Sequence, residues 1–224
     1  MKTAFALLTL ALSVSPAAAR PVLLELFTSQ SCSSCPPAEA LLSHLKATRP
    51  DIVALEFHVD YWNALSWRDP YSSRAATNRQ RTYAAALGTE VFTPQLVIDG
   101  LHSAVGSDRS AVEAAIEASQ HAQPPGPTLA LSQPDHRLTI SVGAGQGDAT
   151  VLLAGYDAAH TTSIPAGENG GAVLSEVNIV RSLKPIGRWT GQTATITVAP
   201  PEGERFAAFL QAADGTILAT AFPN

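Results

Sequence analysis

The sequence predicts an α/β domain followed by an all-β, antiparallel sandwich-like domain. Buried-strand runs alternate with helical stripes up to residue 122, whereas beyond residue 128 apolar residues recur at every second position. Between the two halves, the proline-rich segment 123–127 cannot continue a helix and is typical of a stiff linker. We therefore expect an α/β domain over 20–122, a linker over 123–127 and a β-rich domain over 128–224.

Residues 1–19 have the features of a cleaved signal peptide. Lys2 precedes the apolar-rich stretch 4–14, and Ala17-Ala18-Ala19 ends in the small-x-small pattern that signal peptidase accepts. The apolar stretch is shorter than the roughly 18 residues that a membrane anchor needs. We expect cleavage after Ala19, a mature chain without a transmembrane anchor, and a periplasmic or secreted location in which disulfides persist.

Apolar runs and helical stripes define the elements of the first half. Four short apolar runs predict strands, over 22–27, 52–59, 95–98 and 101–105. Three stretches predict helices, over 38–47, 69–87 and 109–119. Pro36 and Pro37 suit the first turn of a helix, Gly88 suits a C-terminal cap, and Asp99-Gly100 is a strong hairpin signal. The predicted order is β-α-β-α-β-β-α.

Short alternating runs divided by turns define the second half. Leu138, Ile140 and Val142 alternate with polar neighbours, as do Ile196 and Val198. Further apolar runs occur over 151–156, 173–183, 205–212 and 216–221. About six or seven short strands without a helix predict an antiparallel sandwich.

The composition indicates a folded protein that does not bind nucleic acid. Hydrophobic residues make up 46% of the chain and charged residues 15%. Lys and Arg total 14 against 19 Asp and Glu, which gives a formal net charge of -5. The chain has no basic run that could follow a phosphate backbone, no phosphate-cradling glycine loop and no nucleophile elbow. We therefore do not expect a nucleic acid as the partner.

The two cysteines, Cys32 and Cys35, form a CxxC motif directly before the first predicted helix. Thiols at positions i and i+3 of a first turn lie on one face and can close a disulfide. The helix N-terminus favours the thiolate, so we expect Cys32 to be the nucleophile and Cys35 to resolve the mixed disulfide.

The expected function is thiol-disulfide exchange with a protein or small molecule that carries a thiol or a disulfide. This exchange uses the two sulfur atoms alone and needs no cofactor. Because the chain has no third cysteine, a separate redox partner must recycle the pair.

Other interpretations of the CxxC motif stay open. A structural disulfide would close a four-residue loop, which the loop-entropy estimate values at only about 2 kcal/mol. A zinc half-site lacks a second ligand pair, but the cysteines together with His58 could hold a soft metal such as copper. The alternative function is therefore a non-catalytic binding module for a partner protein or a soft metal.

The order of elements, the dithiol at a helix start and Thr93-Pro94 at the head of a strand resemble the thioredoxin-like fold. Four blocks are more narrowly similar to a family of secreted bacterial proteins catalogued as domain of unknown function 1223. They are ELFTSQSCSSCPPAEALL over 25–42, HVDYWN over 58–63, FTPQLVIDG over 92–100 and GENGGAVLSEVNIVRSL over 167–183. This resemblance implies a thioredoxin-like domain followed by a β-rich one, and it brings no established substrate.

The resemblance to thioredoxins leaves Cys35 without an acid–base partner. Their buried acid, six residues before the first cysteine, corresponds here to Leu26. Glu25, one position earlier, points to the opposite face of the strand by parity. Proton transfer to and from Cys35 therefore has no obvious base in the sequence.

The same resemblance implies a substrate groove beside the dithiol. In thioredoxin-like folds, the proline that corresponds to Pro94 follows a cis peptide bond and faces the dithiol. His58 and Trp62 lie at the end of the second predicted strand, which comes out at the same edge. A satisfied strand histidine and a loop-packing tryptophan are the alternatives for these two. We expect the groove to be lined by Thr93, Pro94, Ser33, Ser34, His58 and Trp62.

Overall fold

The computed structural model describes residues 20–122 and 126–222, which form a mixed α/β fold. The expected signal peptide and residues 123–125 of the expected linker lie outside the described residues. The helices are α1 (Pro36–Thr48), α2 (Arg74–Leu87) and α3 (Arg109–Ala122), with a short 3-10 helix η1 (Tyr61–Ala64). The strands of the first half are β1 (Val22–Thr28), β2 (Ile52–His58), β3 (Gln95–Ile98) and β4 (His102–Val105). Those of the second half are β5 (Leu129–Ser132), β6 (Leu138–Val142), β7 (Ala149–Ser163), β8 (Val173–Trp189), β9 (Ala194–Val198), β10 (Arg205–Gln211) and β11 (Ile217–Ala221).

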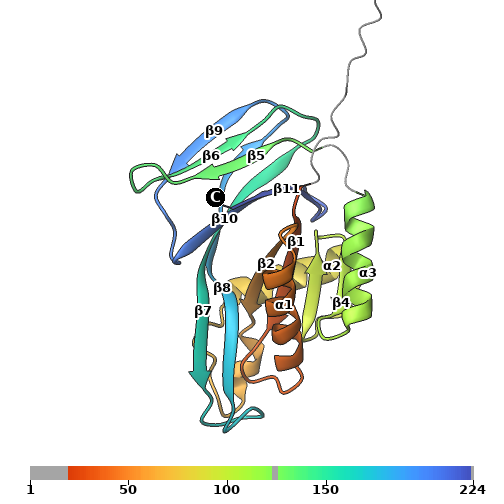
Figure 1. The fold of residues 1–224 in the computed structure, drawn as a ribbon, viewed down its shortest axis with the longest axis vertical. Helices are drawn as coiled ribbons and strands as arrows, with labels where there is room; N and C mark the ends of the chain where they lie inside the picture. Colours follow the sequence, from red (N-terminus) through yellow and green to blue (C-terminus); the bar gives the residue numbers. More distant parts are fainter. Residues whose placement is uncertain (1–19, 123–125, 223–224) are drawn as a thin grey trace, which may run out of the picture.

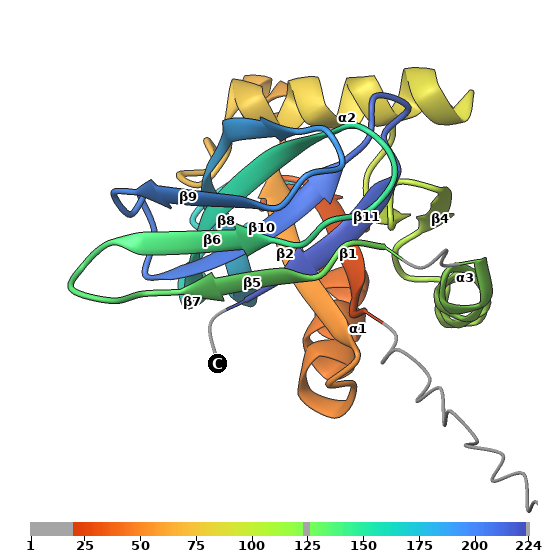
Figure 2. The ribbon, with the colours of Figure 1, turned by 90° about the horizontal axis from the view of Figure 1, so that it is seen from above.

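One eight-stranded sheet runs through both halves, in the order β11-β10-β7-β8-β2-β1-β3-β4. Within it, β1 pairs with β2 in parallel and with β3 in antiparallel orientation. Side chains of β1 alternate between two cores: Leu24 and Leu26 pack with α1 and α3, whereas Leu23 and Phe27 pack with α2. Figure 2 shows these helices on the two sides of the sheet. Because both faces are covered, β1 and β2 are buried along their whole length.

The second half differs from the self-contained sandwich predicted for 128–224. Four of its strands, β7, β8, β10 and β11, continue the sheet of the first half, because β8 runs parallel to β2 with Ile179 opposite Glu56. The remaining strands β5, β6 and β9 form a small second sheet, and β5 lies outside every predicted strand. This sheet packs on the shared sheet around buried Trp189 (Figure 1). A two-layer core of the predicted kind therefore exists, but one layer is shared with the first half.

The strands β7 and β8 form a hairpin that is longer than the predicted runs 151–156 and 173–183. Their pairing extends from Ala149 opposite Trp189 to Ser163 opposite Val173. We call the turn over 164–172 the hairpin tip. Figure 1 shows the hairpin tip at the lower end of the sheet, where α1 also begins.

Most boundaries in the first half agree with the prediction, and α2 is the clear exception. It begins at Arg74 rather than at Asp69, because the Ser73 hydroxyl accepts a first-turn N–H and caps the helix there. Gly88 ends α2 in the left-handed conformation, with φ of 64°, as predicted. Asp99-Gly100 forms the predicted turn between β3 and β4, with φ of 51° and 69°.

Candidate active site

The two cysteines form a disulfide in the loop between β1 and α1. Cys32 and Cys35 are bonded to each other, with Cα atoms 5.4 Å apart. Cys35 is the N-cap residue of α1, and its N–H donates to the Cys32 carbonyl at 3.2 Å. Both cysteine residues are buried, whereas Ser33 and Ser34 between them are exposed. The motif therefore occupies the helix start that the prolines after it predict.

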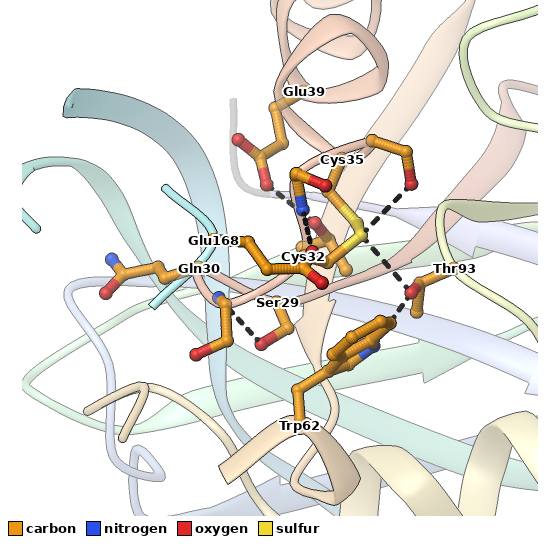
Figure 3. Close-up of a disulfide and its surroundings, with 12 residues drawn as sticks. Ser29, Gln30, Cys32, Cys35, Glu39, Trp62, Thr93 and Glu168 are labelled. Carbon is orange, nitrogen blue, oxygen red and sulfur yellow. Dashed lines mark hydrogen bonds between the residues drawn. A yellow bond between two sulfur atoms is a disulfide. The ribbon is translucent and has the colours of Figure 1, made fainter. Parts of the chain in front are cut away.

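Several predicted groove residues meet at the sulfur of Cys32 (Figure 3). The Thr93 hydroxyl donates to Cys32 Sγ at 3.4 Å and accepts a hydrogen bond from Trp62 Nε1 at 2.9 Å. The Ser34 hydroxyl lies 3.4 Å from the same sulfur atom. The Thr93-Pro94 peptide bond is cis. Ser34 of the dithiol loop and Thr93 of the loop before β3 thus contact Cys32 Sγ, and Trp62 of η1 holds the Thr93 hydroxyl.

His58 lies in a buried group of charged side chains behind the dithiol loop. Its Nδ1 is 2.7 Å from Asp69 Oδ2, and its Nε2 is 3.9 Å from a Glu56 oxygen and 3.7 Å from a Glu176 oxygen. Gln30 connects this group to the dithiol loop, because its backbone N–H donates to Asp69 and its Nε2 donates to Glu176. We call Glu56, His58, Asp69 and Glu176 the acid cluster. His58 is 1% exposed, so the structure places it behind the loop and not on an accessible groove surface.

The acid cluster contains more carboxyl groups than cations. Burial raises the pKa of Glu56 to about 7 and also raises the pKa of Glu176. Burial by itself lowers the pKa of His58, but the charge of Asp69 and its hydrogen bond outweigh burial and hold that pKa well above its usual value. Burial by itself raises the pKa of Asp69, but the charge of His58 and the backbone N–H groups outweigh burial and hold that pKa below its usual value. The cluster is therefore an imidazolium–carboxylate pair flanked by two carboxyls of raised pKa, of which Glu56 is ionised only in part at neutral pH.

Glu39 is a candidate site residue that the sequence analysis missed. Its N–H donates to the Cys35 carbonyl at 3.2 Å, one turn into α1, and the residue is 3% exposed. The Thr28 hydroxyl donates to its carboxyl at 2.6 Å. Burial, followed by the charges of Glu56 and Glu176, raises the pKa of Glu39 to about 8. The signal in the sequence was the i, i+4 spacing from Cys35, which places both residues on one helix face.

The hairpin tip of the second half contacts the dithiol loop directly. The Glu168 carboxylate accepts the Ser33 N–H at 3.0 Å, and Figure 3 shows Glu168 beside Cys32. The Asn169 side chain donates to the carbonyl oxygens of Gln30 and Cys32, both at 3.0 Å. These contacts join residues that are 135 to 139 positions apart in the sequence. No local pattern predicts them.

Within residues 20–122 and 126–222, no group of three or more His, Cys, Asp or Glu side chains is arranged to hold a metal ion. The predicted soft-metal set has other partners, because His58 pairs with Asp69 and the two cysteines are bonded to each other. In the same part of the chain, no helix is long and apolar enough to cross a membrane.

Fold and site together define a mixed α/β protein that carries a CxxC disulfide at the start of a helix. Residues 23–212 match the model of the family described as "Protein of unknown function (DUF1223)", and the chain belongs to this family. It is similar to Protein AGR_C_4864 from Agrobacterium tumefaciens, a crystal structure with 30% identity and a TM-score of 0.80, over 91% of this chain and 94% of that chain. HBP35 of Porphyromonas gingivalis shares the fold, with a TM-score of 0.58 and 12% identity over 92% of this chain and 75% of that chain. No curated protein matches the sequence.

Proposed function

We propose that the protein is a secreted thiol-disulfide oxidoreductase that acts through Cys32 and Cys35 on a thioredoxin-like scaffold. The observation that carries the proposal is the setting of the disulfide. Thr93 donates to the sulfur of Cys32, and Glu39 lies buried one helical turn after Cys35. A dithiol at a helix start, a hydrogen-bond donor at its first sulfur and a buried acid one helical turn after its second cysteine are the groups on which the proposed exchange depends.

The proposed reaction proceeds by two exchange steps. In the reductive direction, the Cys32 thiolate attacks one sulfur of a substrate disulfide, and the other substrate sulfur leaves as a thiolate. The Cys35 thiol then gives its proton to the Glu39 carboxylate and attacks Cys32 Sγ. This step closes the Cys32–Cys35 disulfide and releases the second substrate sulfur as a thiolate. The substrate gains two electrons, the dithiol loses two, and the oxidative direction reverses both steps.

Glu39 suits proton transfer in either direction, because its pKa is about 8. A carboxyl with an ordinary pKa near 4.3 would rarely hold a proton at neutral pH and could not supply one to a departing Cys35 thiolate. At neutral pH Glu39 is mainly protonated and can supply that proton, and its ionised fraction can accept one when Cys35 attacks. The acid that is absent at Leu26 of β1 is thereby provided by α1.

We further propose that the substrate is a protein or small molecule with a disulfide or a thiol. It would reach Cys32 between Thr93-Pro94, Ser34 and Trp62; Thr93 and Ser34 contact the sulfur, and Trp62 bonds to Thr93. A separate redox partner would recycle the pair, because the chain has no third cysteine. The predicted signal peptide supports a periplasmic or secreted location, in which such a partner would meet an oxidising environment.

Trapping of mixed disulfides tests the proposal. In the Cys35→Ser variant the resolving thiol is missing, so substrate should accumulate on Cys32 and be released by a reductant. The matched control is Cys32→Ser, which keeps a single cysteine but lacks the proposed nucleophile and should trap far less. Non-reducing electrophoresis followed by mass spectrometry provides the measurement. The proposal fails if neither variant traps a partner and the wild type neither reduces nor oxidises a glutathione disulfide couple.

A second candidate is a non-catalytic binding module with a structural disulfide. The observation that favours it is the burial of the bridge, with Cys32 1% and Cys35 0% exposed. Reduction kinetics separate the two candidates. A structural bridge should resist dithiothreitol until the protein unfolds, whereas an exchange disulfide should be reduced while the circular dichroism spectrum stays native.

A further inference from the structure

The hairpin tip is hydrogen-bonded to the peptide group that joins Cys32 to Ser33. The Ser33 N–H, directly after Cys32, donates to Glu168, and Asn169 donates to the Cys32 carbonyl. Four backbone hydrogen bonds within 164–172 brace the hairpin tip itself. Glu168 is therefore presented to the dithiol loop by a structured turn of the second half.

A negative charge at this position opposes the chemistry that a helix start normally favours. Unpaired N–H groups and the positive end of the helix dipole stabilise a thiolate near the first turn. Glu168 accepts the Ser33 N–H, directly after Cys32, and so places a carboxylate at the peptide group next to the thiolate. Both effects stabilise the protonated thiol relative to the thiolate.

Glu168 differs from the acid cluster and Glu39, which lie behind the dithiol loop and are buried. Those groups come from α1, β2, the loop before α2 and β8, and they are Glu39, Glu56, His58, Asp69 and Glu176. Glu168 is exposed, and its hydrogen bonds to Ser33 lower its pKa, so it is ionised at neutral pH. Its charge is therefore present over the whole range in which a thiol near it would titrate.

We propose that Glu168 is a positioning residue that stabilises the protonated thiol of reduced Cys32. It thereby favours the disulfide over the dithiol and makes the protein an electron donor to its substrate. This inference rests on the proposed function, because it assigns a direction to that reaction. In the favoured direction the two cysteine thiols lose two protons and two electrons and form their disulfide. One substrate disulfide is reduced to two thiols.

The experiment measures the alkylation rate of Cys32 by iodoacetamide against pH, in the mature chain carrying Cys35→Ser. Adding Glu168→Gln removes the charge and keeps an oxygen that can accept the Ser33 N–H. We expect the midpoint of the rate curve to fall by about 0.2 to 0.7 pH unit at low ionic strength. The plateau rate above the midpoint should fall slightly, because a less basic thiolate is a weaker nucleophile. High salt should reduce the shift, since Glu168 is exposed.

Glu204→Gln is the matched control, because Glu204 is another exposed carboxylate that accepts a backbone N–H, from Ala158 at 3.1 Å. It should leave the midpoint unchanged. Asn169→Ala loosens the hairpin tip and should move the midpoint in the same direction as Glu168→Gln. With both cysteines present, Glu168→Gln should shift the equilibrium with a glutathione buffer toward the dithiol by about 1.5- to 5-fold.

The inference is overturned if Glu168→Gln leaves the midpoint unchanged or raises it. It is also overturned if the plateau rate rises while the midpoint stays, because Glu168 would then only cover the sulfur. These outcomes are independent of mixed-disulfide trapping. A shifted midpoint without trapped substrate would defeat the proposed function and leave only the effect of Glu168 on the Cys32 thiol, and trapping without a shift would defeat this inference alone.

Discussion

The shared sheet carries a buried polar network on each face, and the two networks are balanced differently. On the face that α2 covers, Glu25 forms a 2.6 Å ion pair with Arg79, which also bonds to Tyr83 and to Gln211. On the face that α1 covers, polar atoms of the acid cluster have no hydrogen-bond partner among the described residues. These atoms are both carboxyl oxygens of Glu56, Nε2 of His58 and Oε1 of Glu176.

The difference leads us to expect a structural role for the balanced network and a role in pH response for the acid cluster. Arg79 joins Glu25 of β1 to Gln211 of β10, so the balanced network connects the two halves of the chain. The acid cluster instead gathers carboxyls of raised pKa behind a disulfide. Groups with strongly shifted pKa values concentrate at functional sites. We therefore expect loss of the first network to affect mainly stability, and changes in the second to affect mainly the response to pH.

The largest effect should follow from removing the cation of the balanced network. Arg79→Ala leaves the Glu25 carboxylate buried without its counter-ion, which costs about 3 to 5 kcal/mol of unfolding free energy. Urea denaturation followed by circular dichroism measures this loss. Arg81→Ala, at an exposed position of the same helix, is the control and should change stability by less than about 0.5 kcal/mol. A loss below about 1 kcal/mol in Arg79→Ala would contradict a structural role for this network.

The acid cluster and Glu39 should make the protein less stable as the pH rises. The folded-state pKa values of Glu39 and Glu56, about 8 and about 7, lie above the ordinary value of 4.5. A carboxyl with a raised folded pKa contributes full stability below its unfolded pKa, and this contribution is lost as pH rises through the folded value. His58 acts in the same direction, because its raised pKa means that its ion pair is lost at high pH. The unfolding free energy should therefore fall between pH 5 and pH 9.

Glu39→Gln tests this pH dependence, because glutamine stays neutral throughout. We expect it to remove on the order of 3 kcal/mol of the difference between pH 5 and pH 9. Glu90→Gln, at an exposed position, should leave the pH dependence unchanged. If the wild type were more stable at pH 9 than at pH 5, the described charge state of the cluster would be wrong.

The contrast between the two faces was only partly predictable from the sequence. The strand β1 follows from a local apolar run, and its parity predicts that Glu25 points away from the dithiol, as its pairing with Arg79 shows. The spacing of Glu39 from Cys35 was visible, but its burial depends on how α1 packs against the sheet. Local pattern can place a residue on a helix face, and tertiary packing decides its charge state.

The contribution of the second half to the site was not predictable. The hairpin tip reaches Cys32 because β7 and β8 continue far beyond their apolar runs, and because β8 pairs with β2 at Glu56 and Ile179. Pairing between strands more than a hundred residues apart leaves no periodic signal in either strand. The turn glycines over 167–171 were visible, whereas the role of Glu168 depends on this distant pairing.

A Glu→Gln substitution should change the unfolding free energy in opposite directions on the two faces of the sheet. This is the smallest expected effect, and it tests the difference between the two networks most sharply. At pH 8, Glu176→Gln should stabilise the protein by about 1 kcal/mol, because burial raises the pKa of Glu176 and disfavours its charge in the folded state. This gain should shrink as the pH falls, because protonation then neutralises the wild-type carboxyl. Glu25→Gln should instead destabilise by about 2 kcal/mol at both pH values, since Arg79 would lose its counter-ion. Thermal or urea unfolding of both variants at pH 5 and pH 8 provides the measurement. If both substitutions changed the unfolding free energy in the same direction at pH 8, the two networks would be balanced alike and the acid cluster would be structural.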